Sequence, residues 1–322
     1  MNRFAGLAIA IVLVVGAATA AWFYFAGEIR RNIEIMALND GVTAPRLTCA
    51  RLDMGGFPFS FDALCRDARI EIGDLGIDMP LLEATALVYR LNHIIAKAHG
   101  PAVLSDAFTG ARNEIRWQDL DASLRLGSNR IERLSIVAGP TEWLDTLTGE
   151  TELARLSSLE LHAIDIPERF DETTSTASLA LYSETRNLSA PALQVADGTV
   201  IVEAEVEGVN PAMAGLSQPE AMQLWQQLGG QIKLMRLSAE DAATSLAAEG
   251  EMALTETGLI DGQLRIRSQG VVERLAGLVP QQMQGAVFGT PAADGSYSQT
   301  LNIRGGVILA GLIPAGMIPP LF

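Results

Sequence analysis

Two cysteines, three histidines and 38 acidic residues are the side chains that could do chemistry in this chain of 322 residues. The histidines, His93, His99 and His162, are isolated, and no His-Glu-x-x-His, Cys-x-x-Cys or Gly-x-Ser-x-Gly motif occurs. The carboxylates show no spacing that would pair two of them for acid–base catalysis. We therefore expect no catalytic residues, no metal site and no cofactor, and a protein that is not an enzyme.

Cys49 and Cys65 are the two cysteines. In an exported domain such a pair forms a disulfide, and closing a loop of this size contributes about 3 kcal/mol of stability. In a cytoplasmic domain the same residues would be two unrelated buried thiols. A zinc site would need four ligands, and His93 and His99 lie well downstream. Because a long apolar segment precedes both cysteines, we expect the disulfide.

An aromatic stretch lies between the two cysteines. Phe57, Phe59 and Phe61 alternate with other residues, so in an extended strand they would project to one side. Pro58 confines that strand to a sheet edge or to the beginning of a strand. The three phenylalanines would either pack in the core, pinned by the disulfide, or form the floor of an apolar groove, and we take them as candidate groove residues.

The C-terminus is apolar and contains several prolines. No charged residue follows Arg304, and the prolines argue against a second spanning helix. We expect a strand followed by an apolar tail that packs on the domain or touches a partner. The candidate docking residues are Ile313, Pro314, Pro319, Pro320, Leu321 and Phe322.

The N-terminal segment determines where the rest of the chain lies relative to a membrane. Residues 4–27 carry no charge and would span roughly 36 Å as a helix, enough to cross the ~30 Å core of a bilayer. A cleaved signal would also explain Arg3 and the small residues 18–20. However, the apolar run continues through Trp22 and Tyr24, where an aromatic belt would meet the headgroups. We expect residues 1–27 to remain as a transmembrane anchor.

The remaining residues, 28–322, are expected to form an exported domain. The segment before the apolar run is short, which favours its remaining in the cytoplasm. Long domains are translocated largely regardless of nearby charge. We therefore expect a single-pass protein of the inner membrane with its main domain in the periplasm. The exported part is long enough for two sub-domains, with a boundary near residues 190–230.

The net charge of −15 limits the partners of this domain. Nucleic-acid binding and docking on anionic headgroups both need a basic surface, so neither is expected of the domain as a whole. The expected partners are the membrane, through the first helix, and lipid or other envelope proteins.

Apolar and polar residues alternate along much of the exported part. This pattern is typical of strands with one apolar and one wet face, which belong to antiparallel sheets. It occurs at residues 67–72, 120–126, 200–207, 246–254 and 263–267. Short helices are expected at residues 29–38, 219–228, with Ser217 as N-cap, and 271–278. The predicted fold class is mainly β, with a few helices (α+β).

The aromatic stretch and the C-terminus carry a family resemblance. The Gly56-Phe57-Pro58-Phe59 element between Cys49 and Cys65, and the ending at residues 305–321, resemble the bacterial family called domain of unknown function 2125. Where the usual form of this element has Tyr and a following Arg, this chain has Phe57 and Ser60. The family has no established biochemical role, so this resemblance implies no mechanism.

A second, more distant resemblance rests on the overall pattern. An N-terminal anchor followed by amphipathic β hairpins, such as residues 247–266, is similar to AsmA-type envelope proteins. This resemblance implies a β groove that conducts lipid between membranes.

Two functions compete on these observations. The first is a non-enzymatic envelope protein whose β sheet presents an apolar groove to lipid or another amphiphile. The second is an envelope scaffolding or assembly factor that acts through protein–protein contacts, with the C-terminal tail as its docking segment. A closed β sandwich with a filled core would produce the same sequence pattern as the groove.

Overall fold

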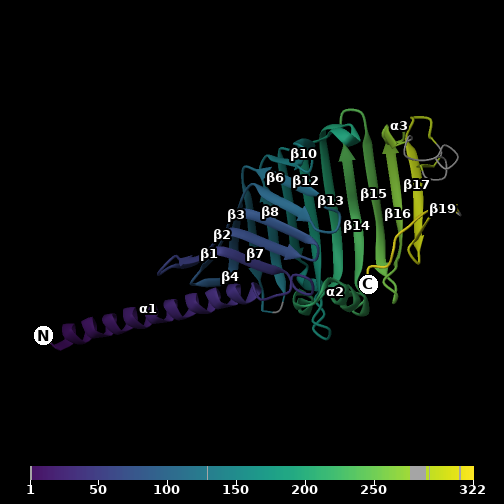
Figure 1. The fold of residues 1–322 in the computed structure, drawn as a ribbon. Helices are drawn as coiled ribbons and strands as arrows, with labels where there is room; N and C mark the ends of the chain where they lie inside the picture. The colour runs from purple at the N-terminus through teal and green to yellow at the C-terminus, as the bar shows by residue number, and fades with distance from the viewer. Residues whose placement is uncertain (1, 129, 276–287, 290, 312) are drawn as a thin grey trace.

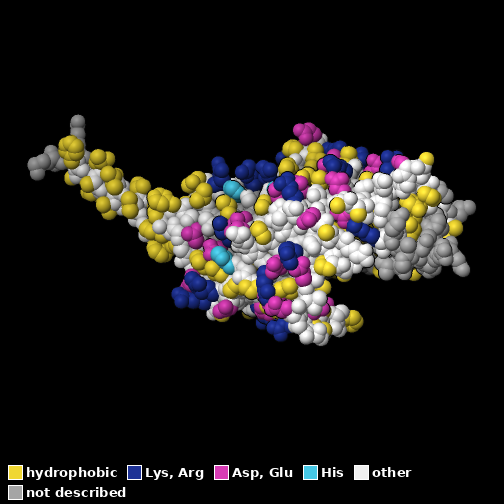
Figure 2. Space-filling view, turned by 90° about the horizontal axis from the view of Figure 1, so that it is seen from above, with side chains coloured by type: hydrophobic (Ala, Val, Ile, Leu, Met, Phe, Trp, Pro, Cys, Tyr) yellow, Lys and Arg dark blue, Asp and Glu magenta, His cyan; other side chains and the backbone are white. Residues whose placement is uncertain are grey.

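The computed structural model describes residues 2–128, 130–275, 288–289, 291–311 and 313–322. It begins with one long helix, α1 (Asn2–Met36), which continues past Glu28 into the helix expected at residues 29–38. The span Phe4–Met36 is long and apolar enough to cross a membrane. Figure 1 shows its N-terminal part standing free of the β domain, and hydrophobic side chains cover that part in Figure 2.

Nineteen antiparallel strands form one connected sheet in the described chain. The first twelve are β1 (Arg46–Gly55), β2 (Ser60–Ile72), β3 (Leu75–Leu87), β4 (Arg90–His99), β5 (Ala102–Asp106), β6 (Arg112–Trp117), β7 (Leu120–Leu126), β8 (Ile131–Ala138), β9 (Thr141–Asp145), β10 (Thr151–Leu156), β11 (Ser158–Asp165) and β12 (Ala177–Ala190). The others are β13 (Val195–Val209), β14 (Gln231–Glu240), β15 (Ser245–Leu254), β16 (Ile260–Gln269), β17 (Tyr297–Arg304), β18 (Val307–Ala310) and β19 (Ile313–Met317).

The sheet splits in two at β3. Residues 81–87 of β3 pair with β4, and residues 75–78 pair with β5. Pro80 lies between the two paired stretches, and because it has no N–H it cannot donate to a continuous ladder. One branch runs β4–β7–β8–β11 and the other β5–β6–β9–β10. Both rejoin at β12, which closes a ring of strands.

An open sheet extends from the ring. Strands β13 to β19 follow β12 in chain order, each antiparallel to the one before it. Figure 1 shows this part as a run of neighbouring strands on the side of the ring away from α1. The expected sub-domain boundary near residues 190–230 falls here, and the backbone pairing of β12 with β13 crosses it.

Helix α2 (Gln218–Gln227) lies between β13 and β14 and confirms the prediction for this segment. Ser217 caps it, and the Glu220 side chain reaches back to the Ser217 backbone N–H at 3.1 Å. The buried Trp225 ring donates its N–H to the Glu207 carbonyl at 2.7 Å, which ties α2 to β13. The other predicted helix is α3 (Val271–Leu275), and residues 276–278 of that prediction lie outside the described residues.

The core of the described chain is thin. None of its large side chains is fully buried, and alanines make up about half of the buried apolar residues. Among the described helices, α1 contacts β1 and β2, α2 contacts β13, and α3 contacts β16. The predicted fold class, a mainly antiparallel β domain after an N-terminal helix, is confirmed.

Candidate binding surfaces of the open sheet

The open sheet has one apolar face, which its strand register defines. Residues directly opposite one another share a face, so Val202, Leu237, Ala248 and Ile266 form one row across four strands. The side chains of this apolar face include Val202, Val206, Ile232, Leu234, Leu237, Leu246, Met252, Leu264, Ile266 and Leu301. Each is half-buried. The apolar face therefore keeps some accessible surface on every one of these strands.

Strict alternation produces this face. Along β15 and β16 the side chains alternate between half-buried and exposed, with Leu246 and Leu264 on the apolar face and Glu249 and Arg265 on the other. An acyl chain placed along such a face would gain about 0.8 kcal/mol of binding free energy for each CH₂ group that it buries. The opposite face, which carries the exposed polar and charged side chains, would keep the sheet soluble at the same time.

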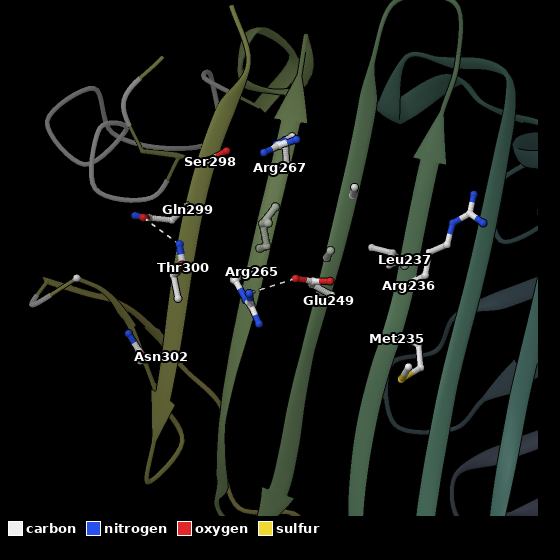
Figure 3. A pocket seen from close by; sticks show the side chains of 14 residues that line it. Met235, Arg236, Leu237, Glu249, Arg265, Arg267, Ser298, Gln299, Thr300 and Asn302 are labelled. Atoms are coloured by element: carbon white, nitrogen blue, oxygen red, sulfur yellow. Dashed lines mark hydrogen bonds and ion pairs between the residues drawn. The ribbon is translucent and has the colours of Figure 1, made fainter. Parts of the chain in front are cut away.

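The opposite, charged face is hollowed. A depression of about 820 Å³ crosses β14 to β18, as Figure 3 shows in part. Its polar lining includes Arg236, Glu249, Arg265, Arg267, Ser298, Thr300 and Asn302, and Leu237, Ala248 and Ile266 of the row above also line it. Arg265 faces Glu249 with Nη1 and Oε1 3.4 Å apart, and Arg236 pairs with Glu203 at 3.5 Å.

This hollow differs in charge from the chain as a whole. Three arginines line it against one glutamate, in a protein with a net charge of −15. Arginine side chains with neighbouring hydroxyl and amide groups can hold an anion by charge-assisted hydrogen bonds. These residues do not form a motif in the sequence. The alternation of Arg265 and Arg267 along β16 is the available signal, but their sharing one hollow with Arg236 depends on the register.

The histidines lie in separate places. His99 Nε2 is 2.9 Å from Glu83 Oε1, His93 Nε2 is 2.8 Å from Ser123 Oγ, and His162 is stacked on Tyr182. No group of three or more His, Cys, Asp or Glu side chains is placed to hold a metal among the residues that the structure describes.

The disulfide prediction is confirmed. Cys49 on β1 and Cys65 on β2 are bonded, with their Cα atoms 5.2 Å apart. They lie on paired strands, where Leu52 is opposite Cys65 and Ala68 is opposite Cys49. The bond therefore fastens the first hairpin of the sheet.

The three phenylalanines do not share one strand, so that expectation is wrong. Phe57 and Phe59 lie in the turn that joins β1 to β2, because Gly56, at φ +92°, accepts backbone hydrogen bonds from Phe59 and Ser60. Phe61 alone is on β2, and it is buried against Trp22 of α1. Phe57 and Phe59 are exposed.

The C-terminal tail lies along the edge of the open sheet. Ile313 and Pro314 pair with β18, and the Leu321 backbone N–H donates to the Gly258 carbonyl at 2.9 Å. Pro319, Pro320 and Phe322 follow β19, without regular secondary structure. Ile313 and Leu321 are exposed, so the tail is packed through its backbone and leaves apolar side chains outside.

A family model described as "Uncharacterized protein conserved in bacteria (DUF2125)" matches residues 22–319. No curated protein matches the chain. The matched range begins at Trp22, where α1 meets the sheet, and covers the entire β domain.

Proposed function

This chain belongs to the bacterial DUF2125 family, and we propose that it is a membrane-anchored, non-enzymatic envelope protein that binds lipid or another amphiphile on the apolar face of its open sheet. The observation that carries this proposal is the apolar face itself. Its side chains stay half-buried across β13 to β17. Of the described helices near it, α2 contacts β13 at Glu207, close to the end of that strand, and α3 begins just after β16 ends.

The covalent link to a membrane helix supports the same proposal. A lipid-binding sheet fixed to α1 would stay within reach of a bilayer. We place the protein in the inner membrane with its β domain in the periplasm, because the Cys49–Cys65 disulfide fits an oxidising compartment. A groove-like role similar to that of AsmA-type proteins is part of this proposal.

Lipid analysis of the purified full chain tests the proposal. The protein is extracted from bacterial membranes in mild detergent and examined by native mass spectrometry for bound phospholipid. We expect bound lipid in the natural protein and at least a fivefold loss in the double variant Leu246→Gln/Leu264→Gln on the apolar face.

A matched control uses the same two strands. The double variant Glu249→Gln/Arg265→Gln changes the opposite face and removes both members of an ion pair without altering net charge. It should retain lipid. Absence of lipid from the natural protein, or equal loss in both double variants when both are folded by circular dichroism, would contradict the proposal.

A scaffolding role is the second candidate, and one observation favours it. Strand β19 ends the described sheet, and Met317 on it is 76% exposed. An edge strand of this kind can accept a strand from another protein. A photoreactive residue at Met317 in cells should then form protein adducts, whereas the lipid-binding role predicts lipid adducts on the apolar face.

A further inference from the structure

A group of exposed aromatic side chains lies where α1 leaves the sheet. The first contributor is the β1–β2 turn, residues 56–59. Its Phe57 ring stacks on Phe23 of α1 at 5.8 Å and meets the edge of Trp22 at 5.4 Å. Phe59, in the same turn, is 74% exposed.

A second turn joins this group. Residues 88–89 connect β3 to β4, and the Val88 backbone N–H donates to the Phe59 carbonyl at 3.0 Å. Tyr89 is 77% exposed, and Val88 and Leu91 are exposed as well. The two turns therefore form one apolar projection, which we call the turn pair: residues 56–59 and 88–89.

The contacts of α1 fix the level of the turn pair along the helix. Trp22 is buried, and its ring N–H donates to the Ser60 carbonyl at 2.8 Å. Further along, Arg30 donates to the Leu52 carbonyl and Arg46 donates to the Ala37 carbonyl. From Trp22 onwards the helix thus runs along β1 and β2, whereas the apolar side chains between Phe4 and Val15 are exposed.

This level coincides with the end of the apolar span. Residues 4–25 would cover about 33 Å as a helix, which matches the hydrocarbon core, and the first charges follow at Glu28. The turn pair lies beside Trp22 and Phe23, at the depth where aromatic side chains meet headgroups. Figure 2 shows hydrophobic side chains along the free part of α1 and charged ones over the β domain.

We propose that the turn pair inserts into the interfacial region of the bilayer, so that Phe57, Phe59 and Tyr89 form a second membrane contact beside α1. The occupant of this patch is lipid because the patch is continuous with the spanning helix. This inference rests on the part of the proposed function that embeds α1 in the membrane. Two contacts instead of one would hold the β domain in a fixed orientation.

Spin-label accessibility in the full chain tests the insertion. Cys49 and Cys65 are paired, so a single cysteine introduced by Phe59→Cys or Tyr89→Cys takes the label alone. The protein is reconstituted in vesicles of phosphatidylethanolamine and phosphatidylglycerol at 3:1. We expect collisions with oxygen to exceed those with a water-soluble nickel chelate at both sites, the pattern of a lipid environment.

Two further sites make the outcomes distinct. Phe108→Cys is a matched control, because Phe108 is 86% exposed in the turn after β5. The backbone N–H of the neighbouring Ala107 donates to the Asp74 carbonyl, just past the far end of β2 and about 40 Å along the strand from Ser60. The label at position 108 should therefore be in water. Val12→Cys reports on the helix. A lipid-like Val12 label with aqueous labels at Phe59 and Tyr89 would overturn the insertion alone. An aqueous Val12 label would overturn the anchoring as well.

Discussion

Trp22 joins the helix to the sheet at the scale of single residues. Its ring stacks on Phe61 at 5.5 Å and donates to the Ser60 carbonyl, so it makes both an apolar and a polar contact with the beginning of β2. Trp22, Ala26 and Phe61 form a small buried cluster, with Ile29 packed against it. The orientation of the β domain relative to α1 depends on this cluster.

Substitutions at Trp22 separate the two contacts. Trp22→Phe keeps an aromatic ring but loses the hydrogen bond, and should lower the free energy of unfolding by about 1 kcal/mol. Trp22→Ala removes the ring as well and should cost about 3–5 kcal/mol. Urea unfolding in detergent micelles, followed by circular dichroism, measures both. Tyr24→Ala is the control: Tyr24 is exposed, so this substitution should change the free energy of unfolding little. Equal losses of unfolding free energy for Trp22→Ala and Tyr24→Ala would contradict this role of Trp22.

Asp241 gives the turn after β14 a dependence on pH. Its carboxylate accepts hydrogen bonds from Arg274 at 2.7 Å and from the backbone N–H groups of Ala243 and Thr244, and these contacts lower the pKa of Asp241 far below its usual 3.8. Because the folded-state pKa is depressed, the stabilisation is fully present above about pH 5, well above the unfolded-state pKa. It is lost as the pH falls towards the folded-state value.

The expected signature is a difference between two proteins across pH. Chemical unfolding of the natural protein and of Asp241→Asn is measured from pH 3 to pH 7. The natural protein should be more stable by a constant amount above about pH 5, and the difference should shrink steadily below pH 4. A difference that stays the same down to pH 3 would show that the carboxylate charge does not stabilise this turn.

At the scale of elements, alternation predicted the strands well. Residues 200–207, 246–254 and 263–267 lie in β13, β15 and β16, because one-sided strands carry a strong local pattern. The α2 helix was predictable for a similar local reason, its Ser217 cap. The disulfide followed from there being two cysteines after an apolar segment.

Features that depend on distant pairing were not predicted. The split of the sheet at β3 arises from two different partners of one strand, and Pro80 is its only local mark. The aromatic turn was mistaken for a strand, because Phe57 and Phe59 alternate as strand residues do while Gly56 forces a turn. The placement of Arg236, Arg265 and Arg267 around one hollow likewise requires the register of β14 to β16.

The disulfide makes a testable contribution at this scale. It links residues 16 apart in sequence, and closing a loop of that length in the unfolded chain stabilises the folded state by about 3 kcal/mol. The double variant Cys49→Ala/Cys65→Ala should lower the unfolding free energy by about that amount without changing the circular dichroism spectrum. An unchanged denaturation midpoint would contradict a stabilising role for the bond.

At the scale of the whole molecule, the chain places three parts in order. The apolar helix comes first, the ring of strands follows beside its C-terminal end, and the open sheet extends from the far side of the ring (Figure 1). The open sheet is one layer of strands with faces of opposite character, apolar on one side and hollowed and charged on the other. The apolar side is the surface on which we propose that an amphiphile binds.

Photo-crosslinking at neighbouring residues of β16 tests the central claim most directly. Leu264 lies on the apolar face and Gln263 on the charged face, so the two positions are neighbours on one strand and differ in face. With a photoreactive amino acid at each position in living bacteria, the account predicts phospholipid adducts at Leu264 and at least tenfold fewer at Gln263. Equal adducts at the two positions, or none at Leu264, would contradict lipid binding on the apolar face.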